Sequence, residues 1–476
     1  MSSGSDKEPV IDRKARMKLP FKDLVFRPPE ERVQDFDPVA RLLTPEEAIE
    51  AARRCIHCPD PAPCQEACPG HNNISAALKL IEEGDFIGAA ELYRQISSLP
   101  EICGLVCPHE DLCQGHCVRA KRGEPVLTGA LEAFVTDYQR KHGEIKVAVG
   151  PDSGRKVAII GAGPAGLSCA DLLRGFGHAV TIFERYPAPG GLLLYGIPNF
   201  KLPKETVHAR IQDILDAGVE FVGNTRIGVD KSIDDLLADG FDAVFIGVGT
   251  GVDATMDAPG SDLPGVHLAT DFLVRTNVDP KLLPEDQRGK LEVGRRVVVI
   301  GGGDTASDCL RSALRLGAEE VTCLYRRTEA EMPGNKKDRH LAEEEGAKFR
   351  FLTQPIRYIE GADGSVAAVE CLQCELGEPD DSGRRRPIPI EGSNFTVEAD
   401  TVILALGYWP DESIGKTTMD LETHKWGLIV VDDETGASSR KGIFAGGDAV
   451  TGPSLVVNAM LAGRRAAEAI NEFLMG

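Results

Sequence analysis

The order of hydrophobic and polar residues divides the chain into a helical first part and a remainder in which strands alternate with helices. Residues 74–83 and 85–97 carry apolar side chains at helical spacing, and residues 129–139 form a further predicted helix. Thr44 followed by Glu47 predicts the start of another helix. In the rest of the chain, short β-branched runs alternate with helical stretches, a pattern typical of parallel sheets covered by helices.

The first strand–helix–strand unit contains a glycine-rich turn. A strand over 157–160 leads into Gly161–Gly166, a helix follows, and a second strand over 180–183 ends at Glu184. In dinucleotide-binding units the first glycine permits a tight turn, the second admits a pyrophosphate, and the third lets the helix pack on the strand. A carboxylate placed like that of Glu184 accepts hydrogen bonds from ribose hydroxyls. The predicted nucleotide site comprises Gly161, Ala162, Gly163, Pro164, Ala165, Gly166 and Glu184.

A second unit of the same kind begins with a strand at residue 297, followed by the turn Gly301–Ala306, a helix and a strand over 321–325. Arg326 and Arg327 come next, where enzymes that use NAD place an acidic residue. Arginine at this position binds a 2′-phosphate through paired hydrogen bonds, so the sequence favours NADPH over NADH. Two solvated surface arginines are the alternative. The predicted site comprises Gly303, Asp304, Thr305, Ala306, Arg326 and Arg327.

Three further apolar strands follow the two glycine turns. Those over 241–249 and 401–407 each end in glycine, and we expect both to cross between the two lobes. A strand over 443–445 precedes Asp448, and a helix is predicted over 454–473. The Asp448 carboxylate can reach ribityl hydroxyls or lie beside phosphates.

Eight of the 13 cysteines fall in two groups, Cys55-x2-Cys58-x5-Cys64-x3-Cys68 and Cys103-x3-Cys107-x5-Cys113-x3-Cys117. Thiolates gathered in this way suit zinc or iron–sulfur clusters, and cysteine followed by proline is similar to the cysteine run of bacterial ferredoxins. Zinc remains the alternative, although only the first pair has the usual knuckle spacing. A redox cofactor downstream favours iron–sulfur clusters. The other cysteines are predicted to be core residues: Cys169, Cys309, Cys323, Cys371 and Cys374. A chemical role for the Cys371-x2-Cys374 pair is the alternative.

Length and charge limit the remaining possibilities. A chain of 476 residues predicts two to four domains. The net charge of −21 disfavours nucleic acid and anionic membranes as partners. No apolar run is long enough to span a bilayer, and the first residues lack the apolar core of a secretory signal. We therefore expect a cytoplasmic protein.

Together these motifs resemble the small (β) subunit of NADPH-dependent glutamate synthase. The resemblance covers nearly the whole chain and includes GAGPAGL, GGLLLYGIPNFKLPKE, GGGDTASDC, CLYRRTEAEMPG and FAGGDAVTGPSLVV. It implies an α/β fold with two dinucleotide-binding, glutathione-reductase-like lobes, preceded by an α-helical ferredoxin-like iron–sulfur domain. The expected limits are 1–150 for the cluster domain, 151–258 and 409–476 for the FAD lobe, and 259–408 for the NADPH lobe.

The resemblance also implies roles for individual residues. One 4Fe–4S cluster is expected on Cys55, Cys58, Cys64 and Cys117, and a second on Cys68, Cys107, Cys113 and Glu132. Cys103 is left as a structural residue. FAD is expected on Gly161–Gly166, Glu184, Arg185, Gly191, Leu192, Lys201, Gly447, Asp448, Ser454, Leu455 and Val456, and NADPH on Gly303–Ala306, Arg326 and Arg327. No side chain is identified as a catalytic acid or base.

In that family, electrons from NADPH pass through FAD and two 4Fe–4S clusters to a large FMN-containing subunit, which forms glutamate from glutamine and 2-oxoglutarate. We expect the same role here. The alternative is the FAD/NADP(H) subunit of an electron-bifurcating ferredoxin:NADP oxidoreductase, which shares the same plan. A third possibility is an assembly subunit whose clusters only stabilise an interface. The sequence does not separate the first two, because they differ in the partner.

Overall fold

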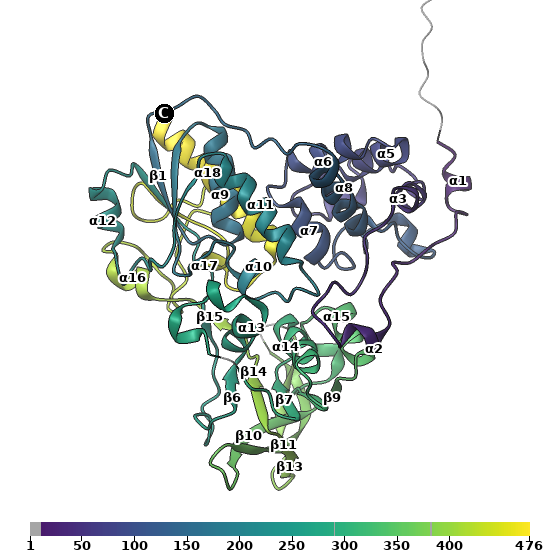
Figure 1. The fold of residues 1–476 in the computed structure, drawn as a ribbon, viewed down its shortest axis with the longest axis vertical. Coiled ribbons are helices and arrows are strands. Elements are labelled where there is room, and N and C mark those ends of the chain that lie inside the picture. The colour runs from purple at the N-terminus through teal and green to yellow at the C-terminus, as the bar shows by residue number, and fades with distance from the viewer. Residues whose placement is uncertain (1–10, 290, 381–382) are drawn as a thin grey trace, which may run out of the picture. The chain divides into compact units, whose positions relative to one another are not determined.

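The computed structural model describes residues 11–289, 291–380 and 383–476, which form two compact units (Figure 1). Unit 1 contains the described residues up to Phe26, together with Ala40–Val147 and Leu455–Leu461. Unit 2 contains Arg27–Val39, Ala148–Ser454 and Ala462–Gly476. The predicted combination of a helical first part with α/β lobes is confirmed.

Unit 1 is helical. Its elements are α1 (Arg13–Arg16), α3 (Pro45–Ala52), α4 (Pro63–Glu66), α5 (Ile74–Glu83), α6 (Phe86–Arg94), α7 (Pro100–Val106), the 3₁₀ turn η1 (Val118–Lys121) and α8 (Thr128–His142). The start of α3 has a reciprocal cap, because Glu47 N donates to Thr44 Oγ1 and Thr44 N donates to Glu47 Oε2. Helices α5, α6 and α8 enclose a core that includes Leu78, Tyr93 and Phe134.

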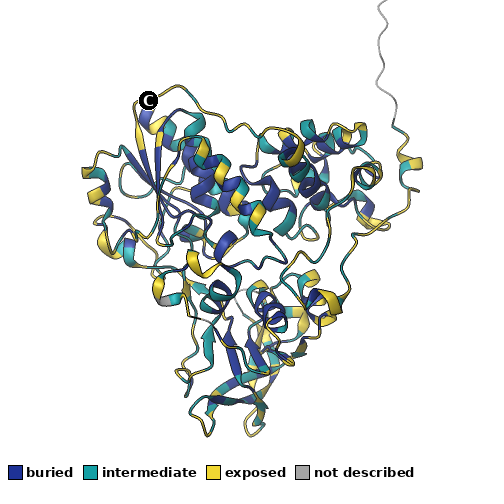
Figure 2. Ribbon diagram, viewed as in Figure 1, coloured by how far each residue is buried: buried dark blue, intermediate teal, exposed yellow. Residues whose placement is uncertain are grey.

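The first sheet of unit 2 is parallel, with strand order β16-β4-β1-β2-β3. Its central strands are buried, as Figure 2 shows in dark blue, which explains their continuous apolar sequence. The strands are β1 (Lys156–Ile160), β2 (Ala179–Phe183), β3 (Glu220–Val222), β4 (Ala243–Ile246) and β16 (Ile443–Ala445). The accompanying helices are α9 (Pro164–Gly175), α10 (Leu192–Tyr195), α11 (Lys204–Asp216), α12 (Ile233–Ala238), α17 (Asp448–Thr451) and the part of α18 (Val456–Met475) that begins at Ala462.

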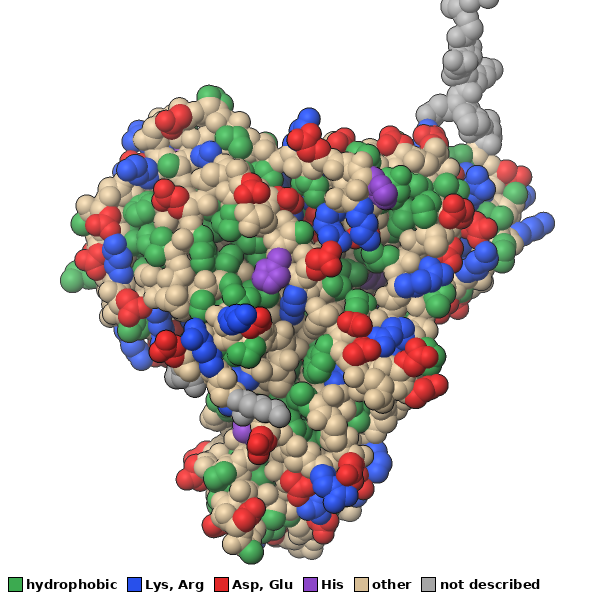
Figure 3. All heavy atoms as spheres, viewed as in Figure 1, with side chains coloured by type: hydrophobic (Ala, Val, Ile, Leu, Met, Phe, Trp, Pro, Cys, Tyr) green, Lys and Arg blue, Asp and Glu red, His purple; other side chains and the backbone are tan. Residues whose placement is uncertain are grey.

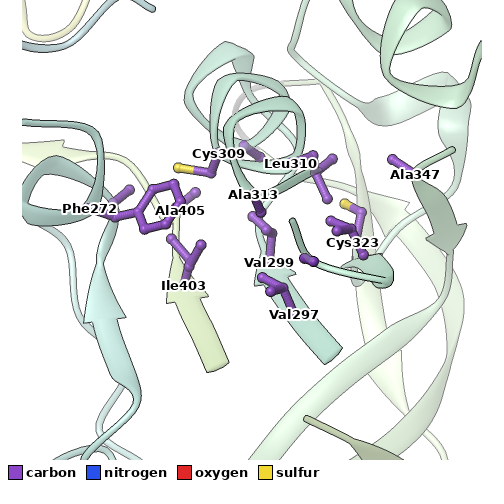
Figure 4. Close-up of a cluster of buried hydrophobic side chains, with 14 of the residues drawn as sticks. Phe272, Val297, Val299, Cys309, Leu310, Ala313, Cys323, Ala347, Ile403 and Ala405 are labelled. Carbon is purple, nitrogen blue, oxygen red and sulfur yellow. The ribbon is translucent and has the colours of Figure 1, made fainter. Parts of the chain in front are cut away.

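The second sheet is also parallel, in the order β6-β14-β7-β8-β9. Its strands are β6 (Val266–Leu268), β7 (Arg296–Ile300), β8 (Glu320–Leu324), β9 (Lys348–Arg350) and β14 (Thr401–Leu404), with helices α13 (Ala269–Asn277), α14 (Asp304–Arg315) and α15 (Lys336–Glu344). Figure 4 shows Phe272, Val299 and Ile403 meeting between sheet and helices. Cys309 and Cys323 point into the same apolar core.

The two strands expected to cross between lobes lie inside the parallel sheets instead, as β4 and β14. The chain crosses immediately after them, where β5 (Val252–Asp253) pairs with β15 (Tyr408–Trp409) in an antiparallel ribbon. The prediction was wrong because a strand buried on both faces has the same apolar pattern wherever it lies.

A four-stranded antiparallel sheet was not predicted. It comprises β10 (Thr353–Glu360), β11 (Val366–Pro379), β12 (Arg385–Pro389) and β13 (Phe395–Glu398). Cys371 and Cys374 are buried on β11. Short turns complete the chain: α2 (Pro29–Arg32), η2 (Pro280–Leu282), η3 (Glu285–Gln287), η4 (Glu329–Glu331) and α16 (Ser413–Thr417).

The surface shows no block of a single charge on the face drawn in Figure 3, where acidic and basic side chains are interspersed. Among the described residues, none of the helices combines the length and the apolar character needed to cross a bilayer.

Candidate functional site

The three glycines of the first turn have different surroundings. A Cβ on Gly161 would lie 2.5 Å from the carbonyl oxygen of Gly247, and the φ of Gly161 is +98°. A Cβ on Gly166 would lie 1.9 Å from the carbonyl oxygen of Gly161. A Cβ on Gly163 would meet nothing within 4 Å. The first and third glycines therefore fit against protein, whereas the second faces open space at the start of α9.

A cavity lies beside this turn and contains Glu184. The Glu184 side chain is buried, with Oε2 accepting from Ala162 N at 2.8 Å and Oε1 accepting from Tyr186 N at 3.0 Å. Arg185 also lines the cavity, with its guanidinium 5.0 Å from the centre of the Tyr186 ring. Each carboxylate oxygen can accept a further hydrogen bond, so Glu184 suits a ribose hydroxyl. Gly191 lies close by, because its Cβ would be 2.8 Å from Gly163 Cα.

Asp448 begins α17 with one carboxylate oxygen unpaired. Its Oδ1 is buried and has no hydrogen-bond partner. Burial raises the pKa of Asp448 to about 6. Such an oxygen needs a donor, and a ribityl hydroxyl is one that fits. Gly447 precedes it at a φ of +69°, Ser454 ends this stretch of unit 2, and Leu455 and Val456 belong to unit 1.

Lys201 lies in a buried ion-paired group. Its Nζ is 2.6 Å from Asp338 Oδ2 and 3.3 Å from Asp308 Oδ1. Burial lowers the pKa of Lys201, but attraction to the two carboxylates outweighs that effect and raises it overall. Its assignment to FAD therefore stays a prediction, while its observed contacts join the segment before α11 to α14 and α15.

The second glycine turn opens into a cavity of about 470 Å³. Gly301 is pressed against β14, because its Cβ would lie 2.1 Å from the carbonyl oxygen of Ala405, whereas a Cβ on Gly303 would meet nothing. Gly303 therefore faces open space in the second turn, as Gly163 does in the first. Four residues of the predicted site line this cavity: Gly303, Thr305, Arg326 and Arg327. The other two do not: Ala306 is buried, and Asp304 is the first residue of α14.

The two adjacent arginines occupy different environments. Arg326 is exposed and lines the cavity. Arg327 also lines it but is buried, with Nη2 2.6 Å from Asp380 Oδ2 and Nε donating to the Arg385 carbonyl at 2.7 Å. Because the guanidinium of Arg327 is already paired, Arg326 is the better candidate for a phosphate contact.

Several lining residues of this cavity were missed by the sequence analysis. They are Tyr325, Gln354, Arg384 and Trp409. Gln354 comes from β10 and Trp409 from β15, in the sheet and ribbon that were not predicted. The run of three arginines at 384–386 could have indicated an anion-binding residue, but no predicted element placed it near the second glycine turn.

The eight clustered cysteines divide between two cavities in unit 1. The first is lined by Cys55, Cys58, Cys64 and Cys117. The second is lined by Cys68, Cys103, Cys107, Cys113 and Glu132. This is the division that the resemblance implies, with Cys103 added to the second set.

The donor sets suit soft metal centres. Burial is the largest cause that raises the pKa of Cys55 to about 12 and that of Cys64 to about 11, so free thiolates are disfavoured there unless a cationic centre binds them. Glu132 Oε1 is buried in the second cavity without a hydrogen-bond partner. In the part of the chain that the structure describes, no three His, Cys, Asp or Glu side chains meet closely enough for a single metal ion.

Two family models match the chain. Residues 32–144 match dihydropyrimidine dehydrogenase domain II, 4Fe-4S cluster, and residues 155–463 match pyridine nucleotide-disulphide oxidoreductase. These matches identify the cysteine-bearing unit as a 4Fe–4S domain and the remainder as an FAD- and NADP-binding oxidoreductase domain.

Individual proteins show the same relationships. The NADPH-dependent glutamate synthase small chain of Halomonas elongata is 42% identical over 94% of this chain and 95% of its own. The NADP(+)-dependent formate dehydrogenase subunit beta of Moorella thermoacetica is 40% identical over 87% of this chain and 60% of its own. The structure of Mycobacterium tuberculosis FprA in complex with NADPH shares the fold, with a TM-score of 0.57 and 21% identity over 67% of this chain and 84% of that chain.

These matches agree with the two glycine turns and the two cysteine-lined cavities. The chain belongs to the pyridine nucleotide-disulphide oxidoreductases and, within them, to the flavin- and iron–sulfur-containing family of the small chain of NADPH-dependent glutamate synthase.

Proposed function

We propose that this NADPH-dependent oxidoreductase is the electron-input subunit of a glutamate synthase. It would pass electrons from NADPH to a large FMN-containing subunit that forms glutamate from glutamine and 2-oxoglutarate. The observation that supports this most strongly is the combination, in one chain, of two open glycine turns with two separate cysteine-lined cavities. The match over nearly the full length of a glutamate synthase small chain favours this partner.

In this proposal FAD is held by Gly161–Gly166, Glu184 and Asp448, NADPH by Gly303–Ala306 and Arg326, and two 4Fe–4S clusters by the cysteines and Glu132. Bound FAD accepts a hydride and releases electrons singly, which the clusters can carry. The chain's own residues bind and orient these groups. Glu184 and Asp448 accept hydrogen bonds from hydroxyls, and the backbone N–H groups at the starts of α9 and α14 face phosphates.

The partner is tested by co-purification with a large glutamate synthase subunit. We expect the complex to oxidise NADPH only when glutamine and 2-oxoglutarate are both present. An NADPH oxidation rate that does not depend on glutamine or 2-oxoglutarate would contradict the proposal. The formate dehydrogenase relative favours a second candidate, in which the same plan serves another electron acceptor. The electron-bifurcating subunit is of this kind, and ferredoxin-linked exchange between NAD(H) and NADP(H) in a complex with an NAD-binding flavoprotein would support it.

The open space over the two middle glycines gives a matched pair of variants. Gly163→Ala places a methyl group where the FAD pyrophosphate is expected, and Gly303→Ala does the same for NADPH. Because neither Cβ meets protein atoms, both variants should fold. We expect overpacking of about 1–3 kcal/mol, or roughly 10–100-fold weaker binding of the nucleotide concerned. Flavin content and the KM for NADPH measure the two effects. Gly163→Ala with full flavin, or Gly303→Ala with reduced flavin, would contradict the assignment.

The different environments of the two arginines give another prediction. Arg326→Ala should raise the KM for NADPH by about 10–100-fold and leave the KM for NADH nearly unchanged, since a hydrogen bond to a charged group contributes about 1.5–3 kcal/mol. Arg327→Ala is the matched control. It breaks the buried pair with Asp380, so it should lower stability and affect both nucleotides alike. Equal changes for NADPH and NADH in Arg326→Ala would refute the phosphate contact.

A further inference from the structure

The second cavity of unit 1 contains more donors than one cluster requires. A 4Fe–4S cluster takes about four protein ligands. Cys68, Cys107 and Cys113 provide three, and both Cys103 and Glu132 line the same cavity. The first cavity differs, because its lining includes four cysteines and no carboxylate. His109 lines the second cavity as well. Among its thiol and carboxyl side chains, the fourth position of the second site has two candidates.

Cys103 lies next to the other donors. It is 5% exposed, on α7, one helical turn before Cys107. The Cys107 N–H donates to the Cys103 carbonyl at 3.1 Å, so consecutive turns of the backbone hold the two residues together. Gly104, the residue after Cys103, packs against α8 beside Glu132, because a Cβ on Gly104 would lie 2.5 Å from Ala133 N. Cys103 is therefore close both to an expected ligand and to its competitor.

A buried hydroxyl also lies near the Cys103 sulfur. The Ser97 hydroxyl lies 3.9 Å from Cys103 Sγ and 3.1 Å from Met460 Sδ, and the Ser97 side chain is buried. Hydrogen bonds to a sulfur ligand orient it and stabilise its thiolate form. Because the hydroxyl has a single hydrogen, it donates to one of the two sulfurs at a time, and it can turn to Cys103 Sγ when that sulfur is a thiolate.

Three buried polar atoms of lining residues lack partners and point to a bound group: Asn72 Oδ1, Glu132 Oε1 and the Tyr93 hydroxyl. The Tyr93 side chain is 2% exposed. A carboxylate is a hard donor, whereas iron in a sulfide cluster prefers thiolate. Glu132 is therefore the weaker of the two candidates for a lasting bond.

We propose that Cys103 is a reserve ligand of the second cluster, able to take the fourth position when Glu132 leaves it. One iron–oxygen bond breaks, one iron–sulfur bond forms, and the thiol proton of Cys103 passes to the released carboxylate of Glu132. No oxidant or reductant is needed. The inference rests on the second cluster of the proposed function.

Iron and acid-labile sulfide per chain test this after anaerobic reconstitution of the full-length protein. We expect about eight iron atoms in the wild type, in Glu132→Ala and in Cys103→Ala, and about four in the double variant. The electron paramagnetic resonance spectrum of the reduced second cluster should differ between the two single variants, because one retains an oxygen ligand and the other a sulfur ligand. Flavin content and circular dichroism report whether each variant is folded.

Three results would overturn the inference. About four iron atoms in either single variant would show that the replaced residue is indispensable. About eight in the double variant would show that another group, His109 or solvent, completes the site. If the double variant does not fold, the iron content and the electron paramagnetic resonance spectra of the two single variants still test the inference. About four iron atoms in the wild type would instead refute the second cluster itself, and with it that part of the proposed function.

Discussion

Cys64→Ser should lose one cluster, so that iron falls from about eight to about four atoms per chain while flavin content stays at the wild-type level. Cys64 lines the first cavity with Cys55, Cys58 and Cys117, and no histidine or carboxylate is among the lining residues that could replace its sulfur. A serine oxygen is a poor ligand for iron in a sulfide cluster. NADPH should still reduce artificial acceptors, because Cys64 lies outside unit 2.

The matched control is Cys103→Ala, a second cysteine change in the same unit, for which we expect no loss of iron. Cys169→Ala in α9 controls for removal of a buried thiol elsewhere. Iron analysis of the three variants checks the prediction. An unchanged iron content in Cys64→Ser would contradict the assignment of the first cavity.

Glu345→Ala should lower the free energy of unfolding by about 3–5 kcal/mol, because it removes the carboxylate that pairs with the buried guanidinium groups of Arg311 and Arg315 and leaves Arg311 with the longer 3.5 Å contact to Asp338. The Glu345 side chain is buried, and its two oxygens accept from Arg311 at 2.9 and 3.0 Å and from Arg315 at 2.6 and 3.2 Å. Urea denaturation measures the loss. Glu343→Ala is the control, since Glu343 is exposed on the same helix, and it should change stability by less than about 0.5 kcal/mol.

The same site predicts a pH dependence. Burial raises the pKa of Glu345, but hydrogen bonds from the two arginines outweigh it and lower the pKa overall. A carboxylate whose folded pKa is depressed stabilises the protein above its unfolded pKa and loses that contribution as the pH falls through the folded value. The difference in stability between wild type and Glu345→Ala should therefore persist at neutral pH and shrink in acid. A difference that grows in acid, or a loss no larger than that of Glu343→Ala, would contradict this account.

Local patterns predicted the parts of the fold that depend on neighbouring residues. The turn at Gly161–Gly166 with its flanking strands, helix α5 and strand β16 follow from apolar spacing and glycine positions. The crossing ribbon β5–β15 was missed because it joins two short strands distant in sequence, and the sheet β10–β13 was missed because its strands mix polar and apolar residues.

In the candidate site, too, the sequence predicted what local spacing determines and missed what depends on distant residues. Spacing identified the cysteines, but Glu132 entered only through the family resemblance, since a carboxylate on α8 carries no cysteine-like spacing. Adjacent positions suggested that Arg326 and Arg327 act alike. Their separation into an exposed and a paired side chain depends on Asp380, more than 50 residues further along the chain, which no local pattern indicates.

The most direct test of the central claim is an anaerobic titration of the full-length protein with NADPH, followed by absorbance and electron paramagnetic resonance. The account predicts that the visible flavin absorbance bleaches and that signals of reduced iron–sulfur clusters appear in the same sample. A protein that is colourless and free of iron after anaerobic reconstitution, or a bound flavin that NADPH does not reduce, would contradict it.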